Sequence, residues 1–162
     1  MAKVERVLRL SGLYKRKEGV SEEEFHSFSR DHAVKCARIH EKYGVLKYQI
    51  AYSSSSAKEL AKSMQTPYAV NEHDLEIEYY FKDTATLLAV SGDQEFKELH
   101  LESEPYVSHE TAKVTLTWIE TYVENGKMVN VGKETNTSLY SSFAELADIK
   151  VSENPVEKYH EE

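Results

Sequence analysis

One long amphipathic helix, predicted over Ser21–Tyr43, constrains what this chain can fold into. Ser21 and Glu24 form the capping-box pattern with which helices begin, and Gly44 is a residue at which they commonly end. On a helical wheel one face collects these residues: Phe25, Phe28, His32, Cys36, Ile39 and Tyr43. His32 therefore faces the core, where a histidine is either a structural group or a working acid/base.

Length and composition limit the class of protein. With 162 residues, 40% of them hydrophobic and 10% aromatic, the chain is expected to form one globular domain with a real core. A net charge of −8 without a basic run argues against nucleic acid as a partner. The single cysteine excludes an internal disulfide, and neither a membrane-length apolar run nor a signal-peptide core is found. We therefore expect a soluble, cytoplasmic protein with no membrane partner.

Four segments show the alternation of apolar and polar side chains that is typical of strands. They are Val4–Lys17, Val45–Tyr52, Asp74–Lys82 and Ala112–Val123. Between the third and fourth strands the pattern predicts a broken helix over Thr84–Val90 and Asp93–Leu99, followed by an irregular stretch over Leu101–Glu110.

The order of these elements predicts an α+β fold of the ferredoxin-like, split βαβ type. In this sandwich one antiparallel sheet carries its helices on a single face. The other face stays open, and we expect apolar positions on it to be covered by a second copy of the chain. The predicted assembly is a homodimer.

The connection Ser53–His73 is unusually long for a compact domain. Long connections of this kind are often lids over a site, so a lid with a short helix over Ala57–Met64 is predicted. His73 ends the predicted lid and begins the third strand.

The C-terminal part of the chain has weaker signals. Asn125-Gly126 predicts a tight turn after the last strand, with Met128–Val131 pairing back. Residues 1–131 are therefore predicted to form the main domain. Residues 132–162 are expected to be an extension, partly mobile or packed on the dimer, with a weak helix over Thr137–Ile149.

The seven histidines carry most of the chemical information. His32, Cys36 and His40 follow one another at four-residue spacing on the long helix, which could hold zinc. No second Cys/His pair has metal spacing, and a lone cysteine is usually a small core residue, so no metal is expected. His100 and His109 flank the irregular stretch before the last strand, from which either could face a cavity.

Sequence motifs for nucleotide or phosphate binding, for a serine nucleophile or for a zinc protease do not occur. An enzyme with this sequence would need chemistry without a cofactor. Proton transfer on a substrate that carries its own electron sink is the natural class, because the pKa of histidine lies near physiological pH. Nearby tyrosines could donate hydrogen bonds to a developing enolate or phenolate.

The first part of the chain contains a series of short motifs in this order: Lys15-Arg16-Lys17, Gly19-Val20-Ser21, Glu24-Phe25 and His32. This series resembles the start of the EthD-type dimeric α/β barrel proteins. Leu75–Lys82 followed by Thr84–Val90 is similar to that family's third strand and second helix. Val114–Lys127 is similar to the last strand of fungal members that act in polyketide pathways. The resemblance spans Val4–Val131.

The resemblance implies a dimeric α/β barrel with a cavity between sheet and helices that binds an aromatic small molecule without a cofactor. It implies a lyase of polyketide biosynthesis, in the first place a decarboxylase of an aromatic or β-keto acid. A cyclase, dehydratase or isomerase of the same fold stays open as an alternative. A non-catalytic small-molecule-binding dimer, and more remotely an oxygenase or heme-type role, also stay open.

His32 matches the helix histidine of the family and is the predicted acid/base, with His109 as the second catalytic candidate. The predicted substrate-binding residues are aromatic residues and histidines from several segments: Tyr14, Tyr48, His73, Tyr79, His100, Tyr106 and Trp118. Tyr48 and Tyr79 are expected to hold the oxygens of the substrate. The stretch 100–109 departs from the family pattern of an acidic residue before an aromatic one, which leaves the substrate and the reaction open.

Overall fold

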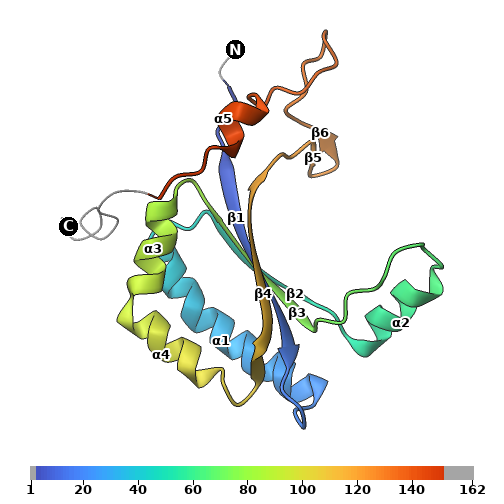
Figure 1. Ribbon diagram of the computed structural model, residues 1–162, viewed down its shortest axis with the longest axis vertical. Coiled ribbons are helices and arrows are strands. Elements are labelled where there is room, and N and C mark those ends of the chain that lie inside the picture. The colour runs from blue at the N-terminus through green and yellow to red at the C-terminus, as the bar shows by residue number, and fades with distance from the viewer. Residues whose placement is uncertain (1–2, 152–162) are drawn as a thin grey trace.

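The computed structural model describes residues 3–151, whose main antiparallel sheet carries helices on one face (Figure 1). The sheet has four strands in the order β2-β3-β1-β4. The elements in chain order are β1 (Val7–Arg16), α1 (Glu22–Lys42), β2 (Lys47–Tyr52), α2 (Ser55–Ser63), β3 (Leu75–Phe81), α3 (Thr84–Gly92), α4 (Gln94–Glu102), β4 (Val107–Ile119), β5 (Val123–Glu124), β6 (Lys127–Met128) and α5 (Phe143–Ala147).

This strand order confirms the predicted ferredoxin-like fold. Both central strands, β1 and β3, pair antiparallel with each other, and β2 and β4 form the two edges. The sheet of one chain is therefore open and does not close into a barrel by itself.

The long helix α1 begins and ends where the sequence predicts. The Ser21 hydroxyl accepts a hydrogen bond from the Glu24 N–H at 3.1 Å, and the Glu24 carboxylate accepts one from the Ser21 N–H at 3.0 Å. This reciprocal pair satisfies two of the N–H groups that a helix start leaves free. Gly44 follows the helix at φ +75°, a left-handed conformation that glycine adopts without steric cost.

The apolar face of α1 packs on the sheet as predicted. Phe25, Cys36 and Ile39 are each only 3% exposed. Cys36 and Ile39 pack with residues of α3 and α4, whereas Phe25 packs with residues of β3 and β4. Since burying one such side chain stabilises a fold by about 1.5–3 kcal/mol, this stripe fixes α1 against the sheet along its whole length.

The last strand begins earlier than the sequence predicts. Val107 and Ser108, placed in the irregular stretch by the sequence, pair with Arg16 and Lys15 of β1 after a shift in register that follows Leu13. The residue types in this stretch do not predict a strand, because it is the pairing with β1 that makes these residues extend β4. As a result, β4 runs alongside almost all of β1 and begins directly after the turn that follows α4.

The second face of the sheet differs from the apolar surface that we expected. Residues of this face form a polar cluster in which Glu78, 9% exposed, is the centre. Arg9 donates to its carboxylate at 3.2 Å, the Tyr80 hydroxyl donates at 3.1 Å, and Gln49 donates as well. Most apolar residues of the two central strands lie on the helix side, because the register pairs Leu8 with Phe81 and the pleat then alternates; Leu13, paired with Glu76, lies on the other face.

The C-terminal extension packs back on β1 of the same chain (Figure 1). The Arg6 guanidinium donates to the carbonyl oxygens of Leu146 and Asp148, both at 3.0 Å, and Leu146 is buried. Here α5 is shorter than the predicted helix over Thr137–Ile149, because its N-cap is Ser142, whose hydroxyl accepts from the Glu145 N–H. The predicted mobile tail falls on residues 152–162, which lie outside the described part.

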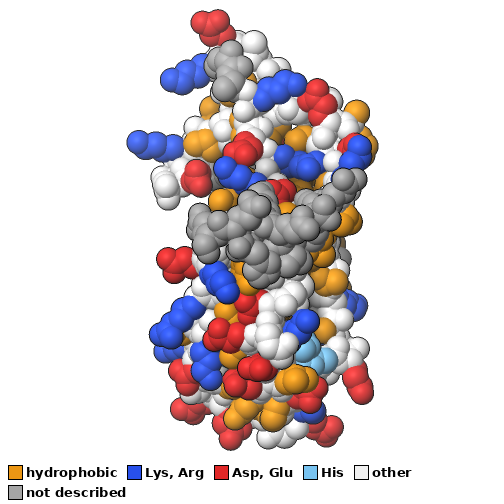
Figure 2. Space-filling model, turned by 90° about the vertical axis from the view of Figure 1, so that its left-hand side faces the viewer, with side chains coloured by type: hydrophobic (Ala, Val, Ile, Leu, Met, Phe, Trp, Pro, Cys, Tyr) orange, Lys and Arg blue, Asp and Glu red, His pale blue; other side chains and the backbone are white. Residues whose placement is uncertain are grey.

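Acidic and basic side chains are interspersed on the face that Figure 2 shows. Within the described part of this face neither charge forms a continuous surface, in keeping with the low basic content of the sequence. Among residues 3–151, every helix is too short or too polar to cross a membrane.

His40 is a fully buried histidine of α1, 2% exposed. Its ring lies against the rings of Tyr48, Tyr79 and Phe96, with centroids 4.5, 4.7 and 5.8 Å away. Within residues 3–151 neither ring nitrogen has a hydrogen-bond partner. Burial lowers the pKa of His40 from 6.5 to about 4, so the imidazole is neutral in the folded protein.

We predict an acid-sensitive fold. Between pH 6.5 and about 4 the unfolded chain protonates His40 whereas the folded chain does not. The free energy of unfolding should therefore be complete above pH 6.5 and fall by roughly 3 kcal/mol as the pH drops through this window. In urea unfolding, the free energy of unfolding of His40→Phe should fall less with decreasing pH than that of the wild type. His26→Phe, on the same helix, should show the same steep fall as the wild type. Equal pH dependence of all three proteins would contradict this assignment.

Candidate active site

An internal cavity of 80 Å³ lies between α1, α4 and the helix side of the sheet. Six of the residues predicted from the sequence line it: Tyr14, His32, Tyr48, Tyr79, His100 and His109. The cavity is also lined by Phe28, Cys36, Ile77, Phe96 and Ser103, among other residues. The structure therefore brings together side chains from β1, α1, β2, β3, α4 and β4 at one place.

Three tyrosines give this cavity hydroxyl groups that keep their protons. Burial raises the pKa of Tyr14, Tyr48 and Tyr79. The rings of Tyr48 and Tyr79 stack at 5.3 Å, and Tyr48 hydrogen-bonds the Cys36 thiol, whose pKa burial raises to about 11. Within residues 3–151 the hydroxyls of Tyr14 and Tyr79 have no hydrogen-bond partner. These two hydroxyls are therefore free to donate to a molecule in the cavity.

His32 stands between this cavity and an outer groove of 580 Å³. Its ring stacks on Phe28 at 5.1 Å, and Phe28 in turn stacks on Tyr106 at 4.1 Å. Burial lowers the pKa of His32 below its ordinary value, and the Glu102 carboxylate only partly opposes this shift. The imidazole is therefore neutral near pH 7, so it carries one nitrogen that can accept a proton and one N–H that can donate a hydrogen bond.

His109 lies at the start of β4, beside the end of α4. Its Nε2 atom is 2.9 Å from the Ser103 hydroxyl, and its ring stacks on that of His100 at 4.5 Å. Burial lowers the pKa of His109, and the neighbouring His100 lowers it further. A second neutral imidazole thus lines the same cavity as His32.

A second cavity of 190 Å³ adjoins the first. The two share Tyr14, Tyr79, Phe96 and His100 as lining residues, and His40 lines the second. Within residues 3–151 no three His, Cys, Asp or Glu side chains are grouped so that they could hold a metal ion.

The sequence matches the EthD domain family over residues 17–110, more than half of the chain. The chain belongs to the EthD domain family. The matched segment runs from the end of β1 to the first residues of β4, so it contains both His32 and His109.

The curated relatives of this EthD protein include fungal proteins. A putative oxygenase of Aspergillus terreus is 37% identical over 135 residues, which cover 80% of this chain and 84% of the relative. The conidial pigment biosynthesis dehydratase EthD of Metarhizium robertsii is 23% identical over 118 residues, covering 70% of this chain and 83% of the relative. The dehydratase aurZ of Gibberella zeae is also 23% identical over 118 residues, covering 70% and 78%.

Among solved structures, a dimeric protein of unknown function with a ferredoxin-like fold from Bacteroides fragilis has a TM-score of 0.51. It is 9% identical in sequence, and the match covers 70% of this chain and 96% of that chain. At this identity the likeness supports the ferredoxin-like fold of the EthD protein and nothing finer.

Three predicted site residues lie outside the cavity of the EthD protein. Tyr106 lines the outer groove behind Phe28. Trp118 lies near the other end of β4, where its ring meets that of Phe143 at 5.8 Å. His73 lies before β3, beside Asn71, whose side-chain oxygen accepts from the His73 backbone N–H at 2.8 Å.

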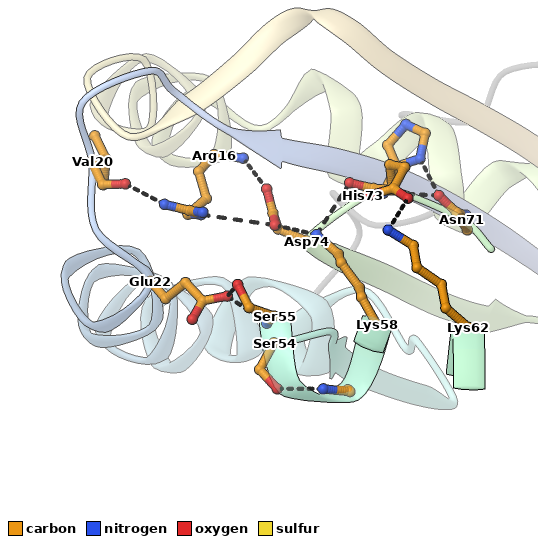
Figure 3. Close-up of polar contacts among 12 residues, drawn as sticks. Arg16, Val20, Glu22, Ser54, Ser55, Lys58, Lys62, Asn71, His73 and Asp74 are labelled. Carbon is orange, nitrogen blue, oxygen red and sulfur yellow. Dashed lines mark hydrogen bonds and ion pairs between the residues drawn. The ribbon is translucent and has the colours of Figure 1, made fainter. Parts of the chain in front are cut away.

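The predicted lid does not cover the cavity, because none of the residues 53–73 lines it. Instead α2 projects away from the other helices (Figure 1), and none of its residues is buried. Polar contacts hold it (Figure 3): Lys58 donates to the Asp74 carboxylate at 2.7 Å, and the Ser55 hydroxyl donates to Glu22 at 2.7 Å. Asp74 also accepts from the Arg16 backbone N–H at 2.7 Å, so one carboxylate joins α2 to β1.

Two residues that shape the site were missed by sequence reasoning. Ser103 is one of many serines, and only the fold brings its hydroxyl to His109. Gly12 leaves room for the ring of Tyr14, since a Cβ atom at Gly12 would lie 2.6 Å from that ring. An isolated glycine inside a predicted strand was the available signal for such a close approach.

We predict that Gly12→Ala distorts the cavity. Its new methyl group must displace the Tyr14 ring, and overpacking of this kind typically costs about 1–3 kcal/mol of the free energy of unfolding. Gly92→Ala, at the end of α3 where nothing lies within 4 Å of the new Cβ, is the matched control. Urea unfolding and near-UV circular dichroism should change for Gly12→Ala alone. The same stability for both variants would contradict the steric interpretation.

We also predict that Asp74 holds α2 in place. Burial alone would raise the pKa of Asp74, but the hydrogen bonds from Lys58 and the Arg16 N–H outweigh it and hold the pKa low. Asp74→Asn should speed amide hydrogen exchange in α2 by about tenfold, since it removes a charged hydrogen bond, and leave α1 unchanged. Glu59→Gln on α2, outside this network, is the control. Unchanged exchange in α2 would show that other contacts position the helix.

Proposed function

We propose that this EthD protein is a cofactor-independent lyase that dehydrates an aromatic polyketide intermediate. One observation carries the proposal: a single internal cavity is lined by two neutral imidazoles and three protonated tyrosines. The imidazoles are those of His32 and His109, and the tyrosines are Tyr14, Tyr48 and Tyr79. Acid/base chemistry on a carbonyl compound needs these groups. The names of the relatives from Metarhizium robertsii and Gibberella zeae support dehydration over other lyase reactions.

In such a dehydration, one imidazole removes a proton from the carbon next to a carbonyl group. The electron pair forms a carbon–carbon double bond, the neighbouring C–O bond breaks, and the leaving hydroxide takes a proton from the imidazolium so formed and departs as water. The carbonyl oxygen gains negative charge on the way. Hydroxyls of Tyr14 and Tyr79 would stabilise that charge by donating hydrogen bonds in a cavity from which water is largely excluded.

Oxygenation is a second candidate function, because the Aspergillus terreus relative is named a putative oxygenase and is the most similar of those described above. Here an imidazole would deprotonate a phenol of the substrate, and the resulting electron-rich ring would reduce O₂ directly. Decarboxylation, the first expectation from the sequence, uses the same residues: an imidazole takes the proton of the carboxylic acid, the C–C bond to the carboxylate breaks with release of CO₂, and the imidazolium returns that proton to the carbon.

We further propose that the protein acts as a homodimer. The strands β2 and β4 leave both edges of the sheet open. Exposed apolar side chains lie on α2 and β4, where Leu60, Met64 and Val114 are 65%, 67% and 67% exposed. The Bacteroides fragilis protein of similar fold is described as dimeric. Light scattering during size-exclusion chromatography tests this, and a monomer at high concentration would contradict it.

Product mass decides between the reactions. The protein is incubated with a panel of hydroxylated aromatic polyketides and their carboxylic acids, and loss of water is the expected change. Loss of CO₂ would assign decarboxylation, and consumption of O₂ with gain of oxygen would assign oxygenation. Binding without any change in mass would contradict an enzyme.

We predict that His32→Ala lowers the turnover number by about 10²–10⁴, the usual contribution of a general acid or base. His26→Ala is the matched control, because His26 lies on the same helix outside the cavity, where its ring meets that of Tyr52 edge to face. An unchanged turnover number in His32→Ala would remove His32 from the mechanism.

A further inference from the structure

We propose that Ser103 is a positioning residue that fixes the proton of His109 on Nε2, so that Nδ1 of His109 is the base and the N–H of His32 donates a hydrogen bond to the substrate. This assignment of roles rests on the proposed acid/base function. The tautomer on which it depends is a property of the resting protein and can be measured without any substrate.

The hydrogen bonds of Ser103 determine the tautomer. The Ser103 hydroxyl is 2.6 Å from the His100 carbonyl oxygen and 2.9 Å from His109 Nε2. A carbonyl oxygen can only accept, so the single hydroxyl hydrogen points to His100. The Ser103 oxygen must then accept from His109, which places the imidazole proton on Nε2.

The other nitrogen of His109 is open. Within residues 3–151, Nδ1 of His109 has no hydrogen-bond partner. This atom is also not fully buried, so it is accessible. Since Nε2 carries the proton of the neutral ring, Nδ1 carries the lone pair. His109 lines both the internal cavity and a surface groove beside Lys15 and Lys17, so its ring borders on both spaces.

His32 has the opposite arrangement. In the described part of the chain, its Nδ1 atom is buried and has no hydrogen-bond partner. Its Nε2 atom is not fully buried. A buried N–H without an acceptor is rarer in proteins than a buried acceptor without a donor, so the neutral ring favours the proton on Nε2. That N–H is the accessible one. Among the described residues, one imidazole thus has a lone pair without a partner, and the other has an N–H without one.

Ser103 is well held in this position. It is 6% exposed, and its backbone N–H caps α4 by donating to the carbonyl oxygens of His100 and Leu101. The backbone cap does not need the hydroxyl, so removal of the hydroxyl alone leaves the end of α4 in place. The charged or titratable groups around His109 are His100, Glu104 and Lys17, and none of them changes with Ser103.

The tautomer is measured first, by ¹⁵N correlation spectroscopy of histidine side chains in the full-length protein without ligand. His109→Gln assigns the His109 signals by their loss. The wild type should show the proton on Nε2, and Ser103→Ala should show a mixture of the two tautomers. A wild-type proton on Nδ1, or an unchanged tautomer in Ser103→Ala, would overturn the proposal even if the enzyme is active.

Turnover supplies the second measurement. Ser103→Ala should lower kcat/KM by about tenfold, since it removes one hydrogen bond, and should move the acidic limb of the pH profile to lower pH, since the imidazolium loses an acceptor. Ser103→Thr keeps the hydroxyl and should restore both. Ser63→Ala is the control, because the Ser63 hydroxyl makes the same kind of bond, to the Leu60 carbonyl at 2.7 Å, without a histidine. A pH profile that Ser103→Ala leaves in place would reduce Ser103 to a structural role.

Discussion

The burial of one stripe of α1 against the sheet is the contact on which the rest of the structure depends. The same stripe that supplies Phe25, Cys36 and Ile39 to the core also carries His32 and His40 inward. Packing therefore places two imidazoles at different depths: His32 at the edge of a cavity, and His40 among three aromatic rings. The core and the candidate site are two parts of one interface.

Burial also determines the charge state of the site. The tyrosines keep their protons and the histidines lack theirs for the same reason, because an apolar surrounding disfavours the charged form of both. No described residue around Tyr14 or Tyr79 competes for their hydroxyls. A cavity lined by neutral donors and neutral acceptors suits proton transfer on an uncharged carbonyl compound, whose negative charge exists only while the reaction is under way.

The sequence predicts the fold and much of the site where side-chain periodicity carries the information. The strands, the start of α1 and its buried face follow from spacing alone, and six of the nine predicted site residues line the cavity. Tertiary contacts decide the rest. Trp118 lies on the same face of the sheet as Leu8, with which it pairs, but too far along β4 to reach the cavity. Ser103 meets His109 only because β4 extends beyond the strand that its own sequence predicts.

The size of the cavity adds a condition on how a ligand binds. Cavities that hold drug-sized ligands are commonly about 300 Å³ or more, whereas the two adjoining cavities here measure 80 and 190 Å³. Tyr14, Tyr79, Phe96 and His100 form the boundary that both share. A ligand of several rings therefore needs these side chains to move apart. Phe96 and His100 belong to the short helix α4, which presents one apolar face to the core, so movement at this boundary disturbs the fold less than a shift of the central strands that carry Tyr14 and Tyr79.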